Sequence, residues 1–81
     1  MKKREINYTL TLIFREIFDN EKMIIKDTTN AKSIKSWDSF MQMNLILSIE
    51  SKFSINFSSR EIEKLKNVGG MIELIYKKKN E

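Results

Sequence analysis

Hydrophobic residues recur at helical spacing in the first part of the chain. They follow one another at intervals of three or four residues, at Ile6, Leu10, Ile13, Phe14 and Ile17. Because an α-helix repeats every 3.6 residues, this spacing places them on one face. The pattern predicts an amphipathic helix from about Glu5 to Phe18.

A second apolar run predicts a helix from Ser39 to Phe53. Its expected inward positions are Met43, Ile46, Leu47 and Ile49. About twenty residues separate it from the first helix, and a loop of that length in a small domain is unusual unless it is functional or pinned. The residues expected to pin this loop are Met23, Ile24, Ile25, Ile34 and Trp37.

The last third of the chain predicts two further helices. Ser58 and Glu61 have the spacing of a capping box, which predicts a short helix from about Ser59 to Leu65 with Ile62 inward. Asn67 is expected to cap a last helix. That helix would bury Val68, Met71, Ile72 and Ile75. No segment alternates with period two over any length, so we expect four helices and no sheet.

Gly69 and Gly70 stand in the first turn of this last helix. Each glycine in a helix costs about 1 kcal/mol relative to alanine. The pair therefore indicates that another backbone segment approaches closely.

The amino-acid composition lacks the residue types that most catalytic mechanisms need. The 81 residues, sufficient for one small domain, contain no cysteine and no histidine, so there is no thiolate and the commonest general base and metal ligand is missing. We expect neither an enzyme nor a metal site.

No apolar run approaches the roughly 20 residues that span a bilayer, and the basic start leads into a segment broken by Arg15 and Glu16. Neither membrane insertion nor a signal peptide is expected, which favours the cytoplasm.

The chain is basic, with 15 lysines and arginines against 11 acidic residues and a formal net charge of +4. Much of this charge lies at the two ends, so we expect basic tails at about residues 1–4 and 77–81 rather than a docking face. No nucleic-acid partner is therefore expected. The alternative function is a small basic helical nucleic-acid-binding domain, which salt-dependent retention on DNA would identify.

Asp38 and Ser39 stand at the start of the second helix. A hydroxyl there lies near free backbone N–H groups and the positive end of the helix dipole, where an anion such as phosphate is favoured. Taken alone, Ser39 also fits an ordinary helix N-cap. Asp38 either complements the positive helix end or belongs to a surface that another protein recognises.

The sequence Asp38-Ser39-Phe40 resembles the Asp-Ser-Leu signature of acyl carrier proteins, with phenylalanine in place of leucine. Further features follow in the family's order from Ile34 to Tyr76. Ser54-Ile55-Asn56-Phe57 stands where the family has Gly-Ile-x-Phe, and Asn67-Val68-Gly69 matches its Thr-Val-Gly or Ser-Val-Gly. About half of the chain takes part in the resemblance.

The resemblance implies an all-α four-helix bundle of the acyl-carrier type, with a long first loop and a short third helix. It also implies that a phosphopantetheinyl transferase uses coenzyme A and magnesium to attach 4′-phosphopantetheine to Ser39, with Asp38 as part of the surface that the transferase reads. The arm's thiol would then carry cargo as a thioester. The acyl pocket is expected to be lined by Phe40, Met43, Ile46, Leu47, Ile62 and Ile72.

The sequence departs from the family in its charge. Acyl carrier proteins are usually acidic and present carboxylates on their second helix, whereas here Glu50 and Lys52 are the only charges after Ser39 in that helix. Because complementary charge selects partners, we expect a carrier dedicated to a specialised pathway, with its own acyl-loading and acyl-accepting enzymes. The sequence also resembles small stand-alone carriers of pathways such as surface polysaccharide modification or secondary metabolism. A monomer is expected because a shuttle must visit several active sites. Peptidyl and D-alanyl carriers share this architecture, and the sequence does not decide between acyl and aminoacyl cargo.

Overall fold

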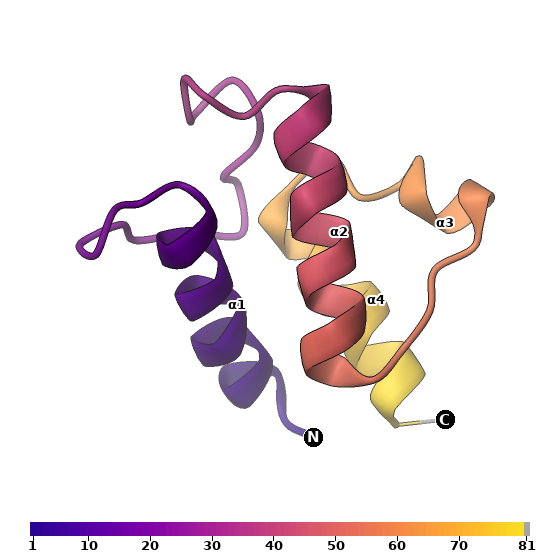
Figure 1. Ribbon diagram of the computed structural model, residues 1–81. Coiled ribbons are helices and arrows are strands. Elements are labelled where there is room, and N and C mark those ends of the chain that lie inside the picture. The colour runs from indigo at the N-terminus through magenta and orange to yellow at the C-terminus, as the bar shows by residue number, and fades with distance from the viewer. Residues whose placement is uncertain (81) are drawn as a thin grey trace.

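The computed structural model describes residues 1–80, which form four helices and no named strand (Figure 1). They are α1 (Lys3–Ile17), α2 (Ser39–Phe53), α3 (Ser59–Ile62) and α4 (Val68–Lys79). α1 and α2 run in opposite directions, α4 lies behind α2, and α3 lies to one side. The predicted all-α bundle with a long first loop and a short third helix is confirmed.

The helix bounds follow the prediction closely except at α3. α2 has the predicted bounds, while α1 begins two residues earlier than expected and ends one residue earlier. α3 ends at Ile62 and not at Leu65. Beyond it the chain turns tightly, because the N–H groups of Lys64 and Leu65 donate to carbonyls only three residues back, at 3.0 and 3.1 Å. This turn brings the chain to the start of α4.

The core is formed by the facing sides of α1, α2 and α4. In α2 the buried residues are Leu45, Ile46, Ile49 and Phe53. Met43 and Leu47, which were expected to point inward, are 49% and 57% exposed. That prediction is wrong because apolar residues lie on several sides of α2, so the pattern alone does not identify the buried side.

The long first loop is pinned to the bundle in two ways. Its Trp37 ring is buried and packs edge-on against Phe14 of α1, with the ring centroids 5.3 Å apart. The carbonyls of Thr29 and Asp27 accept hydrogen bonds from the first N–H groups of α4, both at 2.9 Å. Ile25 is buried as expected, whereas Ile24 is 77% exposed and takes no part in the core.

The basic ends of the chain differ from the predicted tails. Lys3 belongs to α1 and pairs with Glu73 of α4 at 2.6 Å. Residues 77–79 form the last turn of α4, where the Lys79 ammonium donates to the Phe53 carbonyl at the end of α2 at 3.0 Å. A cation at a helix C-terminus is favourable because the last carbonyls there lack partners. Glu81 of the predicted tail lies outside the described residues.

Gly69 accounts for the close approach that the sequence indicated. A Cβ atom at this position would lie 3.0 Å from the Asp27 carbonyl oxygen and 3.3 Å from the Asp27 Cβ. The glycine therefore lets the long loop lie directly against the first turn of α4.

We predict that Gly69→Ala lowers the free energy of unfolding by about 1 kcal/mol, because the overpacking cost exceeds the gain in helix propensity. Urea unfolding followed by circular dichroism measures this. Ser51→Ala, on the exposed side of α2, supplies the control and should leave stability unchanged or slightly raised. A stabilised Gly69→Ala variant would contradict the close approach.

Candidate functional site

Ser39 is the first residue of α2 and is exposed. The N-cap is Asp38, whose carboxylate accepts a hydrogen bond from the Met41 N–H at 2.9 Å. The ordinary capping interpretation therefore applies to Asp38 and not to Ser39. None of the hydrogen bonds formed within residues 1–80 uses the Ser39 hydroxyl, which leaves it available on the surface.

A groove of about 810 Å³ lies beside Ser39. Its walls come from the start of α2, from α3 and the link to α4, and from the long first loop. Both apolar and polar side chains line it, among them Trp37, Gln42, Met43, Ile62, Leu65 and Lys66. An elongated group attached to Ser39 can therefore lie along the protein surface in this groove.

The six residues expected to line an acyl pocket fall into three places. Met43 and Ile62 line this groove together with Ser39 and Asp38. Ile46 and Ile72 are 1% and 6% exposed and lie in the core. Phe40 and Leu47 do not line the groove and are 72% and 57% exposed on α2.

Gln42 joins three segments at the groove. Its side-chain oxygen accepts a hydrogen bond from the Trp37 indole N–H at 2.6 Å, and its side-chain nitrogen donates to the Leu65 carbonyl at 2.8 Å. The hydrophobic pattern of the sequence does not single out Gln42. Its position three residues after Ser39, hence on the same side of the helix, was the available signal.

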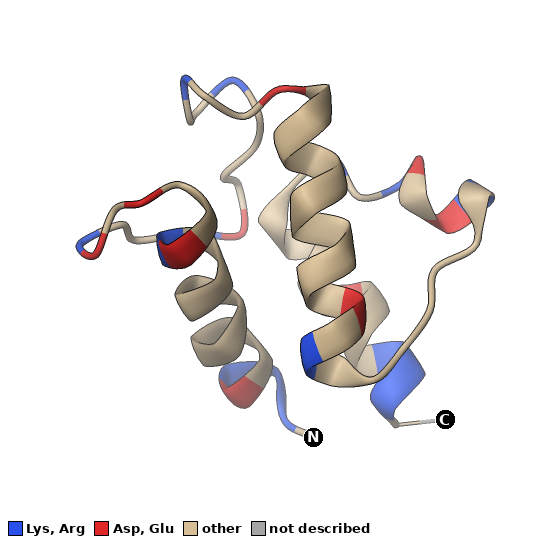
Figure 2. Ribbon diagram, in the orientation of Figure 1, with Lys and Arg blue, Asp and Glu red and all other residues tan. Residues whose placement is uncertain are grey.

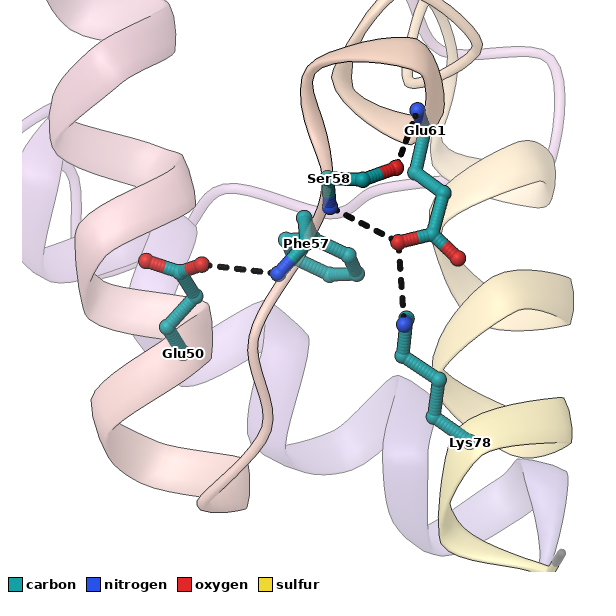
Figure 3. A network of polar contacts seen from close by, with 5 residues as sticks. All are labelled: Glu50, Phe57, Ser58, Glu61 and Lys78. Carbon is teal, nitrogen blue, oxygen red and sulfur yellow. Dashed lines mark hydrogen bonds and ion pairs between the residues drawn. The ribbon is translucent and has the colours of Figure 1, made fainter.

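α3 forms one wall of the groove and is held by a polar network (Figure 3). The predicted capping box is confirmed: the Ser58 hydroxyl accepts from the Glu61 N–H at 3.2 Å, and the Glu61 carboxylate accepts from the Ser58 N–H at 2.8 Å. Lys78 of α4 pairs with Glu61 at 2.9 Å. Glu50 of α2 accepts from the Phe57 N–H at 2.8 Å, so α2 and α4 both hold this segment.

The same contacts change the acidity of Glu61. The Ser58 N–H first, and then the Lys78 ammonium, lower the pKa of the Glu61 carboxyl below its ordinary value of 4.5. A carboxyl whose pKa is lower in the folded state stabilises the fold above its unfolded pKa, and this contribution disappears as the pH falls through the folded pKa.

We therefore predict that the wild-type protein loses part of its stability as the pH drops below about 4.5, and that Glu61→Gln loses less over the same range. Urea midpoints measured at several pH values test this. Glu63→Gln removes a neighbouring exposed carboxylate and should retain the wild-type acid sensitivity. Equal pH profiles for wild type and Glu61→Gln would show that the network does not hold α3.

α2 carries few charged residues, as Figure 2 shows. Its two charged residues are Glu50 and Lys52, and Glu50 is bonded internally to the Phe57 N–H. The exposed side presents Phe40 and Leu47, which are seven residues apart and hence on one face. This side of α2 is therefore uncharged over most of its length.

One solved structure decides the relationship of this chain to known proteins. The chain is similar to the solution NMR structure of a holo acyl carrier protein from Geobacter metallireducens, with 43% sequence identity and a TM-score of 0.83. The match covers 89% of this chain and 83% of that one. The chain belongs to the acyl carrier protein family. No protein-family model and no curated protein matches the chain.

Membership of the acyl carrier protein family settles the broad role of the chain. Acyl carrier proteins carry acyl groups between enzymes, and the chain is accordingly a carrier and not an enzyme. The resemblance seen in Asp38-Ser39-Phe40 and the later motifs is confirmed at the level of family and fold. Among residues 1–80 no helix is both long and apolar enough to cross a membrane.

Proposed function

We propose that Ser39 is the residue of this acyl carrier protein that carries 4′-phosphopantetheine. The observation that supports the proposal is an exposed hydroxyl on the first residue of α2, directly beside a groove. An exposed position lets a modifying enzyme reach the oxygen. The groove then offers a surface along which an elongated arm can lie.

The modification requires a separate phosphopantetheinyl transferase, coenzyme A and Mg²⁺. The Ser39 oxygen would lose its proton to a base of the transferase and attack the phosphorus of coenzyme A that bears the pantetheine. A new oxygen–phosphorus bond forms, the bond to the other phosphate of the pyrophosphate breaks, and adenosine 3′,5′-bisphosphate leaves. The thiol at the end of the arm then carries the acyl or aminoacyl group as a thioester.

Asp38 has two roles in this proposal. Its carboxylate caps α2 through the Met41 N–H and so fixes the first turn on which Ser39 stands. Its exposed position also lets a transferase recognise the charge. A negative charge beside the phosphodiester of the attached arm is unfavourable. Recognition of the carboxylate by the transferase therefore explains an aspartate at this position better than an interaction with the arm does.

The proposed pathway is a specialised one. The uncharged outer side of α2 gives little complementary charge to enzymes that bind carriers through basic patches, and complementary charge both speeds encounter and suppresses wrong partners. We infer a cytoplasmic, monomeric carrier that serves its own acyl-loading and acyl-accepting enzymes.

Intact mass after incubation with coenzyme A, Mg²⁺ and a broad-specificity transferase tests the attachment. The wild-type protein should gain one phosphopantetheine, and Ser39→Ala should gain none because it lacks the oxygen that attacks. Ser59→Ala, which removes another exposed hydroxyl at a helix start, should be modified as the wild type is. An unchanged wild-type mass with several transferases would overturn the proposal.

Two variants separate the roles of Asp38. Asp38→Asn keeps a capping oxygen and should retain stability, whereas Asp38→Ala should lose about 1 kcal/mol. If the transferase reads the carboxylate, both variants are modified more slowly than wild type in a time course followed by mass. Modification of Asp38→Asn at the wild-type rate would leave Asp38 with the capping role alone.

A further inference from the structure

Hydrogen bonds of Gln42 connect residues that line the groove beside Ser39. The Trp37 indole donates to Gln42 at 2.6 Å, and Gln42 donates to the Leu65 carbonyl at 2.8 Å. These bonds run from the long loop across α2 to the link between α3 and α4. All three residues line the groove, so the bonds lie along its inner wall.

The apolar core continues directly beyond Gln42 along α2. Ile46 follows Gln42 by four residues and hence lies on the same side of the helix, one turn further on. It is 1% exposed and belongs to the core. A flexible chain that starts at Ser39 and follows this side of α2 toward the core therefore meets Gln42 before it meets Ile46.

Breaking these hydrogen bonds is unfavourable. Trp37 and Leu65 are 6% and 1% exposed, and an alkyl chain that took the place of the Gln42 side chain would keep water from their polar groups. A buried donor or acceptor that loses its partner costs the full desolvation of that group, which exceeds the net worth of the bond itself. An alkyl chain offers no hydrogen bond in exchange.

Polar side chains are also present around the groove. Its rim includes Asn30, Lys32, Glu63, Lys66 and Asn67. Amides, ammonium groups and a carboxylate there can form hydrogen bonds with the cargo or with the arm. Between these polar groups the lining is mostly apolar and includes Trp37, Met43, Ile62 and Leu65.

We infer that Gln42 determines which cargo this carrier accepts: it keeps the loaded group in the groove, which suits short acyl groups, and bars long alkyl chains from the core. The inference rests on the proposed attachment at Ser39. It gives Gln42 a role in specificity, exerted through Trp37 and Leu65, and it narrows the proposed cargo to short acyl groups.

Loading with acyl groups of two lengths tests the inference on the wild-type protein. A broad-specificity transferase moves the acylated arm from butyryl-coenzyme A or dodecanoyl-coenzyme A, and methyl-labelled isoleucines report where the chain lies. The Ile46 and Ile72 methyl signals should coincide in the two loaded forms, and hydroxylamine should cleave both thioesters at similar rates. Shifted Ile46 and Ile72 signals together with a protected dodecanoyl thioester would overturn the inference.

Variants at position 42 test the residue itself. Gln42→Met has similar length but no amide, so the dodecanoyl form should now shift the Ile46 signal and resist hydroxylamine. Gln42→Glu retains an acceptor for Trp37 but no donor for Leu65, and should give an intermediate effect. Asn44→Ala, which changes an amide of α2 that is not part of the groove lining, is the control and should behave as wild type. A Gln42→Met variant that still excludes the chain would show that Gln42 is not the barrier.

The two proposals fail in different ways. A mass that stays unchanged with both coenzyme A derivatives would overturn the attachment at Ser39 and, with it, this inference. A normal mass gain together with dodecanoyl entry into the wild-type core would overturn only the role of Gln42. Should Gln42→Met not fold, the wild-type comparison and Gln42→Glu still decide.

Discussion

Trp37 connects the core of the bundle to the start of α2. Its ring packs edge-on against Phe14 of α1, and its indole N–H donates to Gln42 of α2. Asp38 and Ser39 follow immediately in the chain. The Trp37 ring is packed against Phe14 and its indole N–H is hydrogen-bonded to Gln42. The residues that follow therefore begin α2 at a fixed place on the surface. The exposure of Ser39 thus follows from the burial of Trp37, two residues earlier in the chain.

The short third helix depends on its neighbours. α3 has four residues, and an isolated helix of that length is unstable because nucleation costs more than a few hydrogen bonds return. The Glu61 carboxylate, bonded to the Ser58 N–H and Lys78, supplies the missing support from side chains. Lys78 also lies 5.8 Å from the centroid of the Phe57 ring. Part of the basic charge at the end of the chain therefore holds the groove wall.

Features with a local physical cause could be predicted from the sequence. The bounds of α2, the capping box at Ser58 and the cap at Asn67 each follow from side chains close in sequence to the backbone that they bind. The glycine at position 69 likewise indicated a close approach, although not the identity of Asp27 as the neighbour.

Features that depend on long-range contacts could not be predicted. Residues 77–79 were read as a tail because a run of lysines gives no sign that the carbonyl of Phe53 and the carboxylate of Glu61 lie within reach. Met43 and Leu47 were placed inward because α2 is apolar on several sides. The linking role of Gln42 could not be predicted because its side chain donates to the Leu65 carbonyl, 23 residues away. In each case the deciding partner is distant in sequence.

The sides of α2 differ in chemistry, and this difference connects the fold to the proposed carrier role. Leu45 and Ile49 face the core, Gln42 and Met43 face the groove, and Phe40 and Leu47 face away from both. Ser39 is the first residue of α2, and all of these sides begin there. A partner on the outer side would therefore reach Ser39 without displacing the groove wall. Because Glu50 is already bonded to the Phe57 N–H, its charge is engaged within the protein, and Phe40 and Leu47 are the large apolar residues that this outer side exposes.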